Sequence, residues 1–333
     1  MRDGVAMGRR GFLALVGGAL LVPARPARAQ SGGPLRRIGF LGNSTEALEA
    51  NLVGPFRDGL REHGYVEGRN LVVEYRWADG QYERMPALVQ ELIALQVEVI
   101  VTAGTPAALA VKRATSRIPL VMVAVGDPVG SGLVASLAHP GGNLTGLVSI
   151  APDLEGKRLE LLKEIVPRLS SVAFLKNPSN RFHVTSEKQA REAARTLQVK
   201  AEFFPVRTAA DLDRAFSAIA DWKPGALVML ADRVFLHNRA RIVEFTDRAR
   251  LPAVYPYTEL VDAGGLMSFG PSYPGMHRRA AYYVDRILKG ARAADLPMEQ
   301  PAQFELIVNL KAARSLGLTI PQPVLLRADQ VLE

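Results

Sequence analysis

The sequence contains no cysteine in 333 residues, which excludes disulfide bonds and lipidation at a cysteine. It also offers no long apolar run near its start. The run Phe12–Val22 is too short to cross the ~30 Å hydrocarbon core of a bilayer. The mature protein is therefore expected to be freely soluble.

Motifs of several enzyme classes are missing as well. We find no G-x-S-x-G elbow, P-loop, H-E-x-x-H or dinucleotide-binding glycine fingerprint. The five histidines are far apart in the sequence and have no metal-ligand spacing; they stand at positions 63, 139, 183, 237 and 277. An enzyme is therefore not favoured, and no catalytic residue, metal or cofactor is expected.

The first thirty residues have the pattern of an export signal. Arg9 and Arg10 precede the apolar run, and Ala27 and Ala29 occupy the A-x-A positions before a cleavage site expected after Ala29. The paired arginines favour a twin-arginine (Tat) signal over a general secretory (Sec) signal, although Gly8 replaces the usual Ser or Thr. We therefore predict a cleaved signal at 1–29 and a periplasmic protein.

Part of the positive charge belongs to this signal. Removal of residues 1–29 takes away five arginines and one aspartate and lowers the formal charge from +8 to +4. Aromatic residues make up only 7%, and the remaining lysines and arginines are scattered rather than clustered among them. No nucleic-acid-binding surface is expected.

The mature chain alternates short β-rich apolar runs with helical stretches, as in parallel sheets covered on both faces. Its length favours two domains. We predict an α/β protein with two doubly wound parallel-sheet lobes. The predicted strands are 37–41, 71–75, 97–102, 120–125 and 144–149 in the first half, and 171–175, 200–204, 226–230, 253–255 and 265–269 in the second.

The chain is expected to cross between the lobes three times. The first crossing is placed at 149–153, where Pro152 would end a strand and Asp153 would cap a helix. The others are placed near 255–264 and 304–309. The predicted N-terminal lobe spans 35–149 plus about 270–305, and the C-terminal lobe spans 150–264 plus about 306–333.

Ligands of parallel sheets bind beyond the carboxyl ends of the strands. In the first half these loops contain Asn43, Ser44 and Thr45, then Gly104, Thr105 and Pro106, then Asp127. Thr105 can cap a helix with Pro106 in its first turn, so free N–H groups would suit a carboxylate. The alternative is a plain cap without a ligand. Asp127 has the same ambiguity, with the structural role favoured.

In the second half the corresponding loops carry Asn177, Asn180 and Asp232. Asp232 is a candidate partner for an ammonium group, or alternatively the cap of a helix beginning near Val234. Tyr257 and Tyr273 could form a flat apolar wall or pack at the hinge.

Several segments together resemble the ABC-transporter substrate-binding protein family whose better-known members bind tryptophan or phenylalanine. Their order and spacing extend over nearly the whole mature chain. The segments are FRDGLREHGY at 56–65, GTPAA at 104–108, DPV at 127–129, PGGNLTG at 140–146, LKG at 288–290, DLP at 295–297 and FELIVN at 304–309.

The resemblance implies the type I periplasmic binding protein fold and a cleft that closes on a small solute, with an amino acid or related carboxylate favoured. It also implies delivery to the membrane permease of an ABC importer, by a protein expected to be a monomer. Many relatives have a more polar loop at this point, and this chain differs by having Arg233 beside Asp232. We expect Arg233 to point outward. If it enters the cleft, the solute could carry an extra negative charge or differ from an aromatic amino acid. A periplasmic sensor for a signalling partner and, less favoured, a secreted enzyme are the alternatives.

Overall fold

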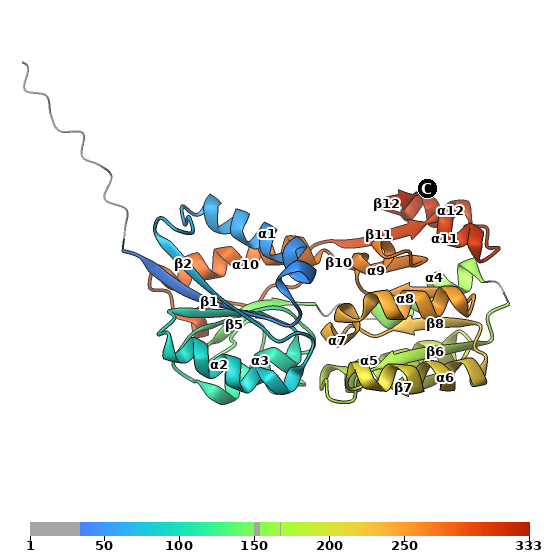
Figure 1. The fold of residues 1–333 in the computed structure, drawn as a ribbon, viewed down its shortest axis with the longest axis horizontal. Coiled ribbons are helices and arrows are strands. Elements are labelled where there is room, and N and C mark those ends of the chain that lie inside the picture. The colour runs from blue at the N-terminus through green and yellow to red at the C-terminus, as the bar shows by residue number, and fades with distance from the viewer. Residues whose placement is uncertain (1–33, 150–153, 167) are drawn as a thin grey trace, which may run out of the picture. The chain divides into compact units, whose positions relative to one another are not determined.

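Two sheets organise the protein (Figure 1). The computed structural model describes residues 34–149, 154–166 and 168–333. The first sheet has the order β2-β1-β3-β4-β5, and the second has the order β12-β11-β10-β9-β8-β6-β7. The strands of the first are β1 (Arg36–Gly42), β2 (Leu71–Trp77), β3 (Val99–Ala103), β4 (Leu120–Val125) and β5 (Leu144–Val148). Those of the second are β6 (Ser171–Lys176), β7 (Lys200–Pro205), β8 (Ala226–Met229), β9 (Ala253–Tyr255), β10 (Met267–Pro271), β11 (Phe304–Asn309) and β12 (Gln330–Leu332).

Helices cover both faces of each sheet, and we call each sheet with its helices a lobe. The first lobe contains α1 (Glu46–Glu62), α2 (Met85–Ala94), α3 (Thr105–Ala114) and α10 (Tyr273–Leu288). The second contains α4 (Leu154–Ile165), α5 (Phe182–Thr196), α6 (Leu212–Trp222), α7 (Arg233–His237), α8 (Arg239–Arg248), α9 (Thr258–Asp262), α11 (Leu310–Ser315) and α12 (Gln322–Arg327). The predicted α/β class with two parallel-sheet lobes is confirmed.

The alternating direction of the apolar side chains along β1 explains why helices cover both faces of the first sheet. Ile38 and Phe40 face the core formed with α1 and α10, whereas Leu41 belongs to the core formed with α2 and α3. Successive side chains of a strand point to opposite faces, so a fully apolar strand needs helices on both. The loops at the carboxyl ends of the strands are left to form a site.

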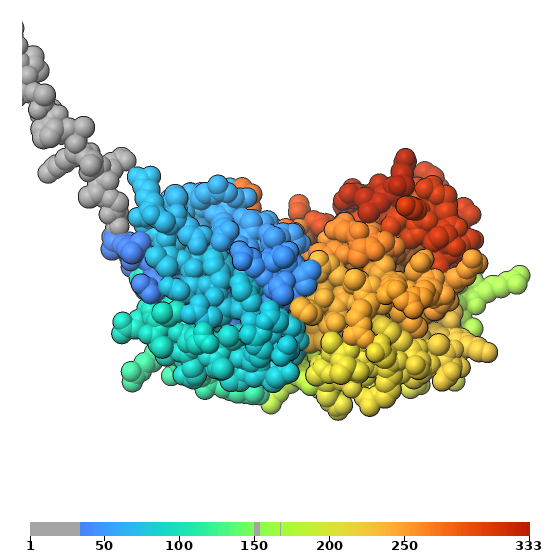
Figure 2. All heavy atoms as spheres, in the orientation of Figure 1, coloured from blue at the N-terminus to red at the C-terminus, as the bar shows by residue number. Residues whose placement is uncertain are grey.

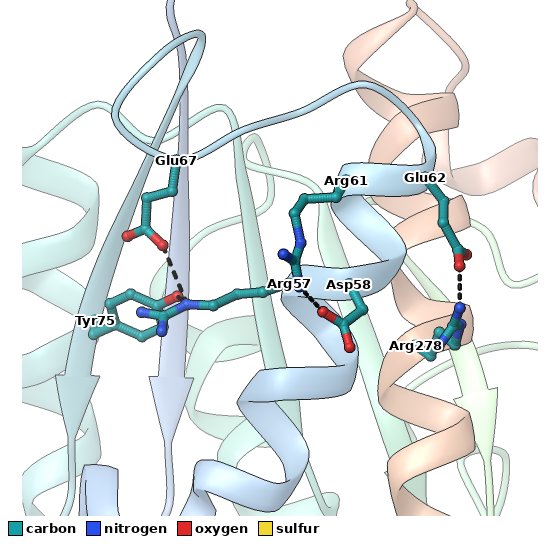
Figure 3. Close-up of polar contacts among 7 residues, drawn as sticks. All are labelled: Arg57, Asp58, Arg61, Glu62, Glu67, Tyr75 and Arg278. Atoms are coloured by element: carbon teal, nitrogen blue, oxygen red, sulfur yellow. Dashed lines mark hydrogen bonds and ion pairs between the residues drawn. The ribbon is translucent and has the colours of Figure 1, made fainter.

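The segment at 56–65 contributes to packing between α1 and α10. A Cβ on Gly59 would lie 2.4 Å from the carbonyl oxygen of Arg278, so glycine is required for the two helices to approach this closely. The charged residues of the segment pair on the surface: Arg57 with Glu67 at 3.1 Å, Asp58 with Arg61, and Glu62 with Arg278 (Figure 3). Arg57 also donates to the hydroxyl of Tyr75 at 2.8 Å.

The crossings differ in part from the prediction. Strands β9 and β10 pair directly in the second sheet, so the segment 255–264 is no crossing; it contains α9. The chain instead leaves the second sheet after β10, where α10 begins and packs on the first sheet. The chain returns to the second sheet directly before 304, after Glu299 has bridged Leu147 of the first sheet, and the segment 304–309 itself is strand β11, which pairs antiparallel with β10. β11 and β12 were not among the predicted strands.

Some predictions fall on segments that the structure does not describe. The export signal at 1–29 and the roles of Pro152 and Asp153 lie outside the described residues. Within residues 34–149, 154–166 and 168–333, no helix is both long and apolar enough to cross a membrane.

Candidate binding site

Loops at the carboxyl ends of strands from both sheets meet around one small cavity. Its volume is about 20 Å³, room for about one water molecule. On the face shown in Figure 2, the atoms of the two lobes meet without an open groove. Seven of the sequence-predicted site residues line the cavity: Gly104, Thr105, Pro106, Asn180, Asp232, Tyr257 and Tyr273.

Asp232 is surrounded by donors from the protein. Its Oδ1 accepts from the hydroxyl of Tyr82 at 2.9 Å, from the backbone N–H of Val234 at 2.9 Å and from Nδ2 of Asn177 at 3.3 Å. Its Oδ2 accepts from Nδ2 of Asn180 at 2.9 Å. The contact with Val234 makes Asp232 the N-cap of α7, so the structural alternative considered for this residue is realised.

Arg233 does not point outward, and that expectation was wrong. The residue is 4% exposed and lines the cavity. Its guanidinium carbon lies 5.2 Å from the ring centre of Tyr257 and 5.1 Å from that of Tyr273. The two rings, 4.8 Å apart, form an aromatic face on which the cation packs, and this face offsets part of the cost of its burial.

The start of α3 differs in detail from the prediction. The N-cap is Gly104, whose φ of +81° is a conformation that favours glycine, and Thr105 is the first helical residue. Thr105 does not cap the helix because its hydroxyl donates to the carbonyl of Gly126 at 3.1 Å. The first turn of α3 still borders the cavity, since Pro106 also lines it.

Five predicted residues lie outside the cavity lining. Asn43 donates to the carbonyl of Ala103, Ser44 contacts Nδ1 of His237 at 2.6 Å, and Thr45 caps α1. Asn177 lies behind Asp232, to which it donates. Asp127 accepts from the backbone of Gly130 and from the hydroxyl of Thr185, which is the structural role favoured for it.

The sequence analysis missed Tyr82 and Phe182, which also line the cavity. Tyr82 follows the carboxyl end of β2, and the loop after this strand was not among the predicted ligand loops. Burial, together with the adjacent Asp232, raises the pKa of the Tyr82 hydroxyl well above 10, so this group remains a proton donor. Its hydrogen bond to Asp232 joins the two lobes.

Further contacts hold the lobes together around the cavity. The hydroxyl of Ser44 meets His237, and Nδ2 of Asn51 donates to Glu259 at 2.7 Å. Two glycines permit this approach: a Cβ on Gly126 would lie 2.3 Å from the ring of Phe182, and one on Gly80 would lie 2.7 Å from the ring of His237. The described structure is therefore a closed arrangement of the two lobes.

Comparison with known proteins places the chain in a family. A family model described as ABC transporter substrate binding protein matches residues 44–332. A tyrosine-binding protein of Clostridioides difficile (strain R20291) is 24% identical over 264 residues, covering 79% of this chain and 75% of the relative.

Two solved structures are similar over 89% of this chain and 99% of their own. One is a conserved domain protein from Vibrio cholerae, with 30% identity and a TM-score of 0.84. The other, from Streptococcus pneumoniae, is an ABC domain in complex with L-Trp, with 26% identity and a TM-score of 0.83. The chain therefore belongs to the ABC transporter substrate binding protein family and has the type I periplasmic binding protein fold.

Proposed function

We propose that this protein is the extracytoplasmic solute-binding component of an ABC importer, which closes two lobes on a small solute and delivers it to a membrane permease. One observation carries the proposal: a cavity lined by charged, polar and aromatic side chains lies where strand ends of both sheets converge. In open α/β sheets this is where ligands bind. Family membership supports the same role.

The favoured solute is an amino acid or a related carboxylate. The first turn of α3 presents N–H groups to an anion, and Tyr257 and Tyr273 add an aromatic wall. Two similar proteins, one a tyrosine-binding protein and the other an ABC domain in complex with L-Trp, support an amino-acid-sized solute. The cavity of about 20 Å³ implies that the lobes or side chains must move to admit it.

Lobe closure follows from differential affinity. A solute that contacts both lobes only when they are closed shifts the equilibrium toward the closed form. A shift from 1:99 to 99:1 requires about 5.5 kcal/mol of preference, which two or three charge-assisted hydrogen bonds with buried apolar area can supply.

The proposal extends to export and delivery. The protein would be exported by the Tat route, cleaved after Ala29 and act in the periplasm as a monomer. Because β10 and β11 both pair in the second sheet, we assign 35–149 plus about 272–303 to the N-terminal lobe, and 154–271 plus about 304–333 to the C-terminal lobe. No catalytic step is assigned to the cavity.

A thermal-shift screen tests this function. The purified protein, refolded to remove endogenous solute, is melted with amino acids, carboxylates, nucleosides and sugars. One chemical class is expected to raise the melting temperature saturably, since a ligand at one hundred times its Kd stabilises the native state by about 2.7 kcal/mol. The absence of any shift, or conversion of the solute into a product, would contradict the proposal.

A further inference from the structure

The two charged neighbours in the cavity, Asp232 and Arg233, differ in how well the protein satisfies them. Asp232 accepts four hydrogen bonds from the protein, three on Oδ1 and one on Oδ2. Both terminal nitrogens of Arg233 are buried and have no hydrogen-bond partner in the described part of the chain. The cavity therefore lacks an acceptor rather than a donor.

Acidic side chains near Arg233 do not supply that acceptor. Glu49 and Glu259 contribute to its electrostatic environment, but neither accepts a hydrogen bond from its terminal nitrogens among the described residues. Glu49 accepts instead from the backbone N–H groups of Asn43 and Ser44, at 2.8 and 2.7 Å. Glu259 accepts from Asn51. Both carboxylates thus have other partners.

The surrounding tyrosines stabilise the charge of Arg233 without satisfying its N–H groups. The rings of Tyr257 and Tyr273 lie about 5 Å from the guanidinium carbon, a cation–π arrangement that offers no acceptor in the plane of the guanidinium. A guanidinium remains protonated at all working pH values, so burial leaves a permanent cation with unused donors. A bound carboxylate would accept from two of these donors at once.

We propose that Arg233 binds an anionic group of the solute, and that the solute is a small carboxylate with net negative charge rather than a zwitterionic amino acid. Asp232 already accepts from four protein donors, whereas both terminal nitrogens of Arg233 lack an acceptor among the described residues, so the unmet demand in the cavity is for an anion. This inference rests on the proposed function and narrows its solute class.

Calorimetry with defined probes tests the inference. Acetate, succinate, L-tyrosine and L-tryptophan are titrated into the wild-type protein and into Arg233→Met, Arg233→Lys and the exposed control Arg248→Met. We expect acetate or succinate to bind, Arg233→Met to weaken that binding about 10- to 100-fold, and Arg233→Lys to weaken it less. The control should bind as the wild type does.

Stability provides the second measurement. Arg233→Met is expected to melt at the same temperature as the ligand-free wild type or higher, because an apolar side chain of similar length replaces an unpaired buried charge. A purely structural arginine would instead lower the melting temperature and leave affinity unchanged. If Arg233→Met does not fold, Arg233→Lys alone decides the affinity comparison.

The outcomes separate the two proposals. Binding of tyrosine or tryptophan with an affinity that Arg233→Met leaves unchanged would overturn the inference and leave the solute-binding function intact. Binding of none of the four probes would overturn the inference, while the wider thermal-shift panel would still test the function. Carboxylate binding that depends on Arg233 supports both.

Discussion

Two buried arginines in different regions of the molecule have opposite surroundings. Arg158, on α4 in the second lobe, is 1% exposed and forms an ion pair with Glu155 at 2.9 Å. It also donates through Nε to the carbonyl of Phe269 at 2.9 Å. Arg233, at the cavity, is 4% exposed and has no partner for either terminal nitrogen among the described residues.

The difference distinguishes a structural cation from one available to a ligand. Burial of a charge is tolerated in a fold when the same chain supplies the opposite charge and the hydrogen bonds, as it does for Arg158. Among the described residues, Arg233 has aromatic rings against its guanidinium and carboxylates in its wider surroundings, but no acceptor for its terminal nitrogens, and it lies beside a cavity. An unpaired cation at this place is best explained by a partner that arrives with the solute.

The largest predicted effect concerns the paired arginine. Arg158→Met should lower the free energy of unfolding by about 3–5 kcal/mol, because Glu155 would remain buried without its partner. The double variant Arg158→Met with Glu155→Leu should recover much of this loss, since both charges are then removed. Urea denaturation measures both variants. A loss below about 1 kcal/mol for the single variant would show that Arg158 is not a structural cation, and the contrast with Arg233 would then be wrong.

A smaller effect concerns lobe closure over the cavity. Gly126→Ala places a Cβ within 2.3 Å of the Phe182 ring and should hold the lobes apart. We expect solute affinity to fall about 10-fold, equivalent to ~1.4 kcal/mol, measured by calorimetry. The control is Gly54→Ala on α1, where a Cβ would meet nothing within 4 Å. Wild-type affinity in Gly126→Ala would show that solute binding does not require this closed arrangement.

The third effect is a pH dependence of stability. Burial, assisted by the charge of Arg233, lowers the pKa of His277 to about 3 from an ordinary 6.5. The folded protein therefore binds this proton more weakly than the unfolded chain. The contribution of neutral His277 to the free energy of unfolding is fully present above pH 6.5 and is lost as the pH falls toward 3.

Below pH 6.5 the loss due to His277 should approach ~1.4 kcal/mol per pH unit, which gives a loss of about 1.4 kcal/mol between pH 7.5 and pH 5.5. His277→Gln should remove this part of the slope, while the exposed His139→Gln should not. Urea denaturation at pH 7.5 and 5.5 compares the three proteins. An identical slope in the wild type and His277→Gln would mean that His277 is not buried in its neutral form.

Much of the fold follows from local pattern. The predicted strands at 120–125 and 253–255 have the observed bounds, and the others of the first sheet differ by no more than two residues at an end. Strand β11 was missed because it follows directly on the return of the chain to the second lobe, so the segment was interpreted as the crossing itself. Its antiparallel pairing with β10 is a long-range contact that no local periodicity encodes.

The site was predictable only to the level of loops. The rule that ligands bind at strand ends led to Thr105, Asn180 and Asp232, all of which line the cavity. It could not tell that Tyr82 reaches Asp232 from the other lobe, or that Arg233 turns inward between two tyrosines. Side-chain direction depends on packing between segments about 150 residues apart.

The most direct test is a crystal structure of the protein purified from its native compartment with its solute retained. Our account predicts an anionic oxygen of the solute within about 3 Å of the terminal nitrogens of Arg233, with Asp232 still bound to Tyr82. A solute ammonium group on Asp232, with the guanidinium of Arg233 still unpaired, would contradict it.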